Sequence, residues 1–82
     1  MPYALVIVEK SESRPWSSDM RSLLDSLPQQ EGVSKMNESA LLIDVATNPL
    51  SLCDLLKYAH NDRLVHHVFF YDQKPSYTTY KN

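Results

Sequence analysis

Hydrophobic residues follow two kinds of pattern along the first part of the chain, one typical of a strand and one of a helix. Residues 3–8 are rich in β-branched, aliphatic and aromatic side chains at odd and even positions alike. Both faces of a strand would therefore be apolar, which indicates a central strand buried on two faces. Across residues 16–27 the apolar positions recur every three to four residues, as on an amphipathic helix. Ser17 or Ser18 is the expected N-cap, and Pro28 ends the helix.

The middle of the chain predicts a hairpin. Residues 33–36 have a short strand pattern and residues 40–46 a strong one. Asn37 and Glu38 between them favour a turn. Gly32, the only glycine, marks the turn before the hairpin, where we expect a positive φ.

A second helix and a fourth strand follow the hairpin. Asn48 and Pro49 form a helix start, with a capping side chain followed by proline at the first helical position. Residues 64–71 are rich in Val, Phe and Tyr and predict a strand. The apolar stripe expected on the inner side of the second helix comprises Leu52, Leu55, Leu56 and Ala59.

The resulting element order is strand, helix, strand, strand, helix, strand, which predicts a ferredoxin-like α+β fold. We expect a four-stranded antiparallel sheet formed by residues 1–74, with both helices on one face because crossover connections are right-handed. The other face of the sheet is then left bare although its strands offer it apolar side chains. Either the C-terminal tail or a second copy of the chain must cover it.

The tail, residues 75–82, is expected to be extended. Pro75 cannot donate a ladder hydrogen bond, so it favours a break after the fourth strand, and residues 77–80 have high strand propensity. We expect the tail to pair with an exposed sheet edge of its own subunit or of its partner. Deleting it should then weaken dimerisation more than it weakens the subunit fold.

Composition narrows the class of protein. The 82 residues suffice for one domain, and the net charge of −2 gives no general attraction to nucleic acid or to an anionic membrane. The single cysteine allows no internal disulfide, and no apolar run approaches the length of a membrane span. These features predict a cytoplasmic protein without membrane contact.

Most candidate catalytic and metal motifs can be set aside. His66 and His67 are adjacent in a strand, so their side chains point to opposite faces and cannot bind one metal ion. Cys53, beside the apolar stripe of the second helix, is expected to be a small core residue rather than a reactive thiol. One glycine is too few for a phosphate-binding or dinucleotide-binding loop.

Three carboxylates near strand ends require closer attention, because carboxylates gathered at one place can hold Mg²⁺. Glu9 closes the first strand and Asp72 the last, and Asp44 is expected beside Glu9 in the third strand. The simplest interpretation of Glu9 and Asp72 is that they are solvated strand ends. Asp44 lies between Ile43 and Val45, so its carboxylate needs a partner or an exposed face.

The fourth strand offers one face to the core and the other to a partner, and the sequence leaves open which is which. One face holds His67, Phe69 and Tyr71. The other face holds His66, Val68 and Phe70. Aromatic residues on a sheet can stack on bases, but the strand lacks the interleaved basic residues of RNA binders, which favours a dimer interface. The residues predicted for it are His67, Phe69, Tyr71, Tyr77 and Tyr80.

Three segments carry a family resemblance: MNESALLIDV from Met36, the second helix, and NDRLVHHVFF from Asn61. Together they resemble the small CRISPR-adaptation-nuclease-like proteins, which include the SinR-like proteins and the GhoS antitoxin ribonuclease. The resemblance spans residues 3–71. It implies a homodimer of ferredoxin-like subunits and, in members that cut nucleic acid, a divalent metal held by an aspartate at the end of strand one. Glu9, followed by Lys10, corresponds to that position here.

The sequence thus supports two hypotheses. The first is a small homodimeric binding or regulatory module, acting through protein or RNA contacts without an assembled active site and without a cofactor. The alternative is a metal-dependent endoribonuclease of the resembling group, in which Glu9 binds Mg²⁺ and Asp44 assists. Glutamate is one methylene longer than aspartate, and this favours the first hypothesis.

Overall fold

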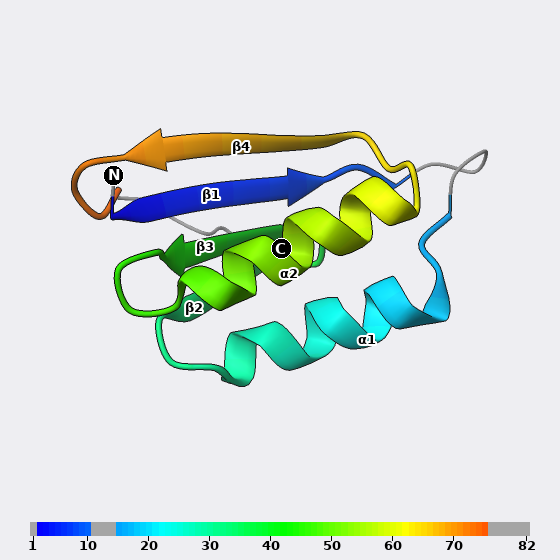
Figure 1. The fold of residues 1–82 in the computed structure, drawn as a ribbon, viewed down its shortest axis with the longest axis horizontal. Coiled ribbons are helices and arrows are strands. Elements are labelled where there is room, and N and C mark those ends of the chain that lie inside the picture. The colour runs from blue at the N-terminus through cyan, green and yellow to red at the C-terminus, as the bar shows by residue number, and fades with distance from the viewer. Residues whose placement is uncertain (1, 11–14, 76–82) are drawn as a thin grey trace, which may run out of the picture.

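The computed structural model describes residues 2–10 and 15–75, and its elements follow the predicted order (Figure 1). Four strands and two helices follow one another in the expected order, with one short 3-10 turn, η1, directly after the first helix. The elements are β1 Tyr3–Val8, α1 Ser18–Ser26, η1 Leu27–Gln29, β2 Val33–Asn37, β3 Ala40–Asp44, α2 Pro49–Asn61 and β4 His66–Tyr71.

The strands form one antiparallel sheet in the order β2-β3-β1-β4. β1 lies between β3 and β4, and β3 lies between β1 and β2, so each helix connects two parallel strands that are separated by a third. This is the split arrangement of the ferredoxin-like fold, and the predicted fold class is confirmed.

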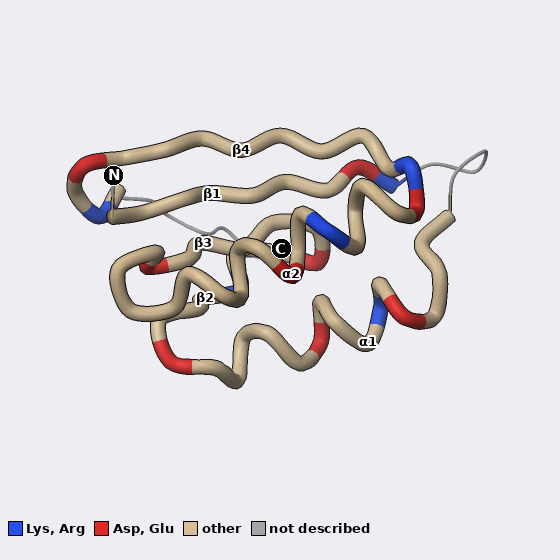
Figure 2. The backbone as a smooth tube through the Cα atoms, in the orientation of Figure 1, with Lys and Arg blue, Asp and Glu red and all other residues tan. Residues whose placement is uncertain are grey.

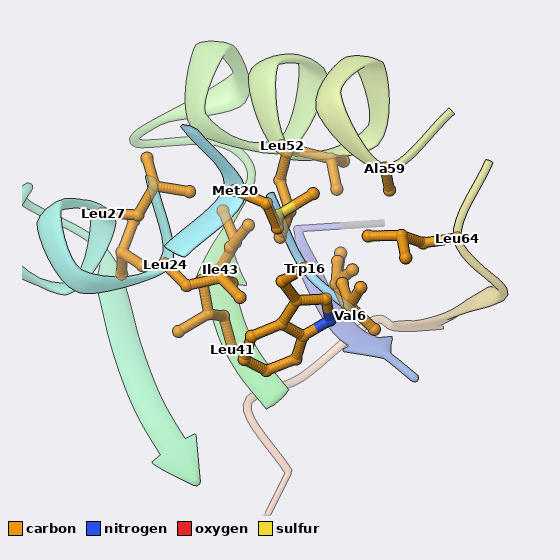
Figure 3. Close-up of a cluster of buried hydrophobic side chains, with 14 residues drawn as sticks. Val6, Trp16, Met20, Leu24, Leu27, Leu41, Ile43, Leu52, Ala59 and Leu64 are labelled. Carbon is orange, nitrogen blue, oxygen red and sulfur yellow. The ribbon is translucent and has the colours of Figure 1, made fainter. Parts of the chain in front are cut away.

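The core lies between the sheet and the two helices, which pack on the same face (Figure 3). Every second residue of β1, namely Ala4, Val6 and Val8, is completely buried there. Met20 from α1 and Leu55 from α2 are also completely buried in this cluster. The alternation along β1 shows that only one face of this strand belongs to the helix-covered core.

Several local predictions are confirmed by hydrogen bonds. The Ser17 hydroxyl accepts the Met20 amide at 3.1 Å and caps α1. The Asn48 side chain accepts the Ser51 amide at 3.2 Å and caps α2, with proline at the first helical position. Gly32 has a φ of 82°, as expected for the turn before the hairpin.

Trp16 directly precedes the Ser17 cap, as the expected N-cap implies, and its ring is buried in the core. The expectations for single residues of α2 are confirmed only in part. Leu55 and Ala59 of α2 are completely buried, whereas Leu56 is only partly buried and packs at the margin of the core. Cys53 is exposed rather than a core residue, because it falls on the outer side of α2. The predicted stripe therefore packs on the core with Leu56 at its margin, and only the core position expected for Cys53 is wrong.

Two ends of elements also differ from prediction. β3 ends at Asp44, because the chain turns there towards α2. β4 begins at His66, two residues later than predicted, because Arg63 takes a left-handed φ of 57° and Leu64 closes the end of α2 through its amide.

Neither described helix has the length and apolar character required for a membrane span. The predicted tail strand at 77–80, including Tyr77 and Tyr80, lies outside the described residues.

Candidate functional site: the helix-free face of the sheet

In the described part of the chain, one face of the sheet carries no helix, and most of its side chains come from β1, β3 and β4. Residues directly opposite each other in an antiparallel pair place their side chains on the same face. The register therefore groups nine residues, called here the open face: Tyr3, Leu5 and Ile7 of β1, Ala40, Leu42 and Asp44 of β3, and His67, Phe69 and Tyr71 of β4.

The register also decides which side of β4 is core. Val68 lies opposite the fully buried Val6 and packs against the core, so its side of β4 faces the helices. His67, Phe69 and Tyr71 consequently lie on the open face, as required of the predicted interface residues. His66 and His67 are on opposite faces, as the strand pattern predicted.

Exposure on the open face rises steeply from β3 to β4. Leu42 of β3 is only 2% exposed and Ala40 is 6% exposed. Phe69 and Tyr71 of β4 are 48% and 36% exposed. The β4 side of the face thus presents large aromatic surface to solvent, whereas Leu42 and Ala40 on the β3 side are buried.

The two edges of the sheet differ in how they are protected. The edge strand β2 carries Lys35, and its register shifts between Lys35 and Asn37. Charged residues and irregularities of this kind are the usual protection against pairing with another sheet. The edge strand β4 carries no Lys, Arg, Asp or Glu and keeps one regular register over six pairs with β1 (Figure 2). Among residues 2–10 and 15–75, β4 is therefore the sheet edge that lacks such protection against pairing.

Glu9 and His67 form a polar contact at one end of the open face. His67 Nε2 lies 2.6 Å from Glu9 Oε2, and both side chains are about half exposed. The backbone holds Glu9 in place, since its amide donates to the Val65 carbonyl at 2.8 Å and its carbonyl accepts the Trp16 indole N–H at 3.2 Å. Sequence reasoning missed His67 as the partner of Glu9, because only the pairing of β1 with β4 brings them together.

Asp44 does not lie beside Glu9, and this expectation is wrong. Asp44 is opposite Tyr3, at the start of β1, while Glu9 follows the end of the same strand. At about 3.3 Å per residue, the two positions are roughly 20 Å apart along the sheet, which is too far for one cation in one subunit. Asp72 follows β4 and is at the Asp44 end.

Asp44 has the partner that its position required. Its two carboxylate oxygens accept the Thr47 amide at 3.2 Å and the Thr47 hydroxyl at 3.0 Å, which fixes the turn into α2. Among residues 2–10 and 15–75, no group of three or more His, Cys, Asp or Glu side chains is placed to hold a metal ion.

Two hollows flank these groups. One of about 130 Å³ lies on the open face at its Asp44 end and is lined by Tyr3, Gly32, Ser34, Leu42, Asp44 and Lys74. The other, of about 290 Å³, lies on the helix side near Trp16, where Lys10 Nζ is 5.1 Å from the centre of the indole ring. Its lining mixes cations with Asp25 and Glu38, which gives it no single charge preference.

Comparison with known proteins adds no relative. No protein-family model, curated protein or solved structure matches this chain. The resemblance to the CRISPR-adaptation-nuclease-like group therefore stays a prediction, and the function must be argued from the open face and from β4.

Proposed function

We propose that this chain is a homodimeric binding module of regulatory type, whose subunits meet at β4 and at the aromatic side of the open face. The observation that carries this proposal is the contrast between the two sheet edges: β2 is protected by Lys35 and a register shift, and β4 by neither. An unprotected edge with exposed aromatic residues would be an aggregation hazard in a monomer.

A second copy of the chain is the partner that fits this edge. Two β4 strands related by a two-fold axis run antiparallel, so each donates to and accepts from an identical strand. β4 carries no Lys, Arg, Asp or Glu, so no such side chains of like charge meet across the axis. The exposed rings of Phe69 and Tyr71 are then buried against the same residues of the second copy.

The open face is better suited to contact protein than RNA. β1, β3 and β4 contribute no Lys or Arg to the open face, and the chain has a net charge of −2. Binding to nucleic acid relies on cations that neutralise phosphates. Aromatic surface without cations is instead typical of the centres of protein interfaces, and here the second copy of the chain uses it.

A charge placed on β4 tests the proposal. We expect the parent chain to have the mass of two 9.4 kDa subunits in light scattering at tens of micromolar, and Phe69→Lys to have the mass of one. Leu50→Lys is the matched control, because Leu50 is 73% exposed on α2, away from the sheet edge. A parent chain of monomer mass, or a Phe69→Lys dimer as stable as the control, would contradict the proposal.

The endoribonuclease alternative is kept because one specific contact favours it. Glu9 presents a half-exposed carboxylate beside an imidazole at the end of β1, where the resemblance places a metal ligand. If this alternative holds, Mg²⁺ or Mn²⁺ should support cleavage of a fluorescent RNA, and Glu9→Gln should abolish it. The binding-module proposal predicts no cleavage by either chain, with cleavage by a known ribonuclease as the control for the substrate.

A further inference from the structure

Backbone groups of β4 point alternately towards β1 and towards the outer edge of the sheet. The Glu9 amide donates to the Val65 carbonyl at 2.8 Å, in the register that continues through the six pairs of β1 with β4. The Val8 amide, one residue earlier, donates at 2.8 Å to the carbonyl of Ser39, on the β3 side of β1. In an antiparallel pair every second residue exchanges its N–H and C=O bonds with the neighbouring strand, and the residues between point the other way. The odd-numbered residues of β4 are therefore bonded to β1, and its even-numbered residues face the outer edge.

Three residues thus direct their backbone groups to the outer edge of β4: His66, Val68 and Phe70. β4 is the last strand in the sheet order, so no strand among the described residues lies beyond it. A second β4, related by a two-fold axis, can bond these groups in an antiparallel ladder. Because the two strands are identical, each possible register is defined by the residue that lies opposite its own copy.

One register pairs all three of these residues within β4. With Val68 opposite Val68, His66 lies opposite Phe70 on both sides of the axis, and each pair exchanges its N–H···O bonds. With Phe69 at the centre instead, His66 would have to pair with Asp72, which lies in the bend after β4. The register centred on Phe69 therefore loses the bonds of His66.

The register centred on His67 is also incomplete. It would place Phe70 opposite Leu64, which precedes β4. The Leu64 amide already donates to the Ala59 carbonyl at 2.9 Å, and the Leu64 carbonyl lies 2.9 Å from His66 Nδ1. Both backbone groups of Leu64 are thus engaged within the subunit, so this register leaves Phe70 without a pair.

We propose that β4 pairs with β4 of a second copy in the register centred on Val68, so that residues 66–70 recognise themselves. This register rests on the dimer proposed above and specifies which residues meet in it. The segment reads HHVFF, with two histidines before Val68 and two phenylalanines after it. Every histidine of one copy then lies opposite a phenylalanine of the other, and no phenylalanine lies opposite a phenylalanine.

The pair of His67 with Phe69 provides the main side-chain contact on the open face. Both residues are bonded to β1, so across the dimer they form a non-hydrogen-bonded pair, in which side chains are closer. Phe69 is 48% exposed, and His67 is held by Glu9 of its own subunit, whose Oε2 lies 2.6 Å from Nε2. The Phe69 ring of one copy is therefore covered by an imidazole whose position is fixed in the other.

The corresponding pair on the helix side contributes less contact. Phe70 lies opposite His66 of the second copy in this register. The His66 imidazole, however, is drawn back along its own strand, with Nδ1 2.9 Å from the Leu64 carbonyl oxygen. Phe70 therefore gains less from the second copy than Phe69 does.

Contacts between α-protons of the parent chain test the register. Isotope-labelled and unlabelled copies are mixed, and only nuclear Overhauser effects between copies are recorded. We expect an effect between His67 Hα and Phe69 Hα, because the Cα atoms of a non-hydrogen-bonded pair are only about 4.5 Å apart. An effect between two Phe69 Hα atoms, or between two His67 Hα atoms, would reveal a different centre and overturn the proposed register.

Disulfide formation between copies is a second, independent measurement. A Cys53→Ser background removes the exposed native thiol. In it, Val68→Cys should form a disulfide-linked dimer about tenfold faster than His67→Cys, because the Cα atoms of a hydrogen-bonded pair, about 5.5 Å apart, are within disulfide range. Leu50→Cys, 73% exposed on α2, is the control for random collision. Faster crosslinking of His67→Cys than of Val68→Cys would contradict the register.

Failure of the register is distinguishable from failure of the dimer. A parent chain of single-subunit mass in light scattering would overturn both. A parent chain of dimer mass that lacks the contact between His67 and Phe69 would overturn the register and leave the homodimer in place. The same holds for a dimer in which Val68→Cys crosslinks no faster than Leu50→Cys.

Discussion

The Ser17 hydroxyl donates a hydrogen bond to Asp62 Oδ2 at 2.5 Å, joining the start of α1 to the end of α2 across 45 positions of sequence. The same hydroxyl accepts the Met20 amide as the cap of α1. One serine thus provides a hydrogen-bond acceptor for a free amide in the first turn of α1 and also links the two helices that cover the sheet. Both side chains are partly buried, so the link is shielded from water on one side.

A double-mutant cycle on this pair should show coupling. Ser17→Ala removes the cap and the link, so we expect a loss of about 1–2 kcal/mol in the free energy of unfolding. Asp62→Ala should lower the free energy of unfolding by less, because Ser17 still caps α1. The double variant should cost about 0.5–1 kcal/mol less than the two single losses combined. Urea denaturation gives all four values, and strictly additive losses would show that the link contributes nothing.

The two leucines predicted on the inner helix faces should now behave differently. Leu24 is buried in the core, so Leu24→Ala should cost about 2–5 kcal/mol. Leu56 is only half-buried, so Leu56→Ala should cost clearly less. Leu55→Ala, at a fully buried position next to it, is the matched comparison and should equal Leu24→Ala in its effect. Equal unfolding midpoints for Leu55→Ala and Leu56→Ala would contradict the helix orientation.

Gly32 should tolerate no side chain. Its φ of 82° disfavours any other residue, and an added Cβ would lie 3.2 Å from the side chain of Thr47 and 3.3 Å from Asp44 Cβ. We expect Gly32→Ala to lower the free energy of unfolding by about 1–2 kcal/mol from the backbone alone. Thr47→Ser removes one of the contacting atoms, Cγ2, but leaves Thr47 Cβ and Asp44 Cβ in place, so in this background Gly32→Ala should still cost at least the backbone contribution. A neutral Gly32→Ala in thermal unfolding would contradict this turn geometry.

The two neighbouring phenylalanines of β4 distinguish the faces of the proposed interface. Phe69 and Phe70 are equally exposed, at 48% and 47%, but lie on the open face and on the helix side respectively. Burying a phenylalanine contributes about 1.5–3 kcal/mol, so Phe69→Ser should weaken dimerisation by roughly 10-fold to 100-fold. Phe70→Ser should weaken it much less. Sedimentation equilibrium measures both, and the reverse ranking would place the interface on the helix side of β4.

The sequence by itself determined which elements form and in what order. As helix caps, Ser17 and Asn48 each accept an amide three positions away, and Gly32 acts through its own backbone, so these particular roles were readable from neighbouring residues alone. The ferredoxin-like order followed from these local patterns together with the handedness of crossover connections. The alternation within β4 was also predicted, but not which face is core.

Only the tertiary structure decided which distant residues meet. Glu9 lies beside His67, 58 positions away, and is separated from Asp44 by the length of β1. The difference between the protected edge at β2 and the unprotected edge at β4 likewise required the strand order. The physical reason is that pairing partners and register depend on how all four strands fit one common core, and no local stretch of sequence contains that information.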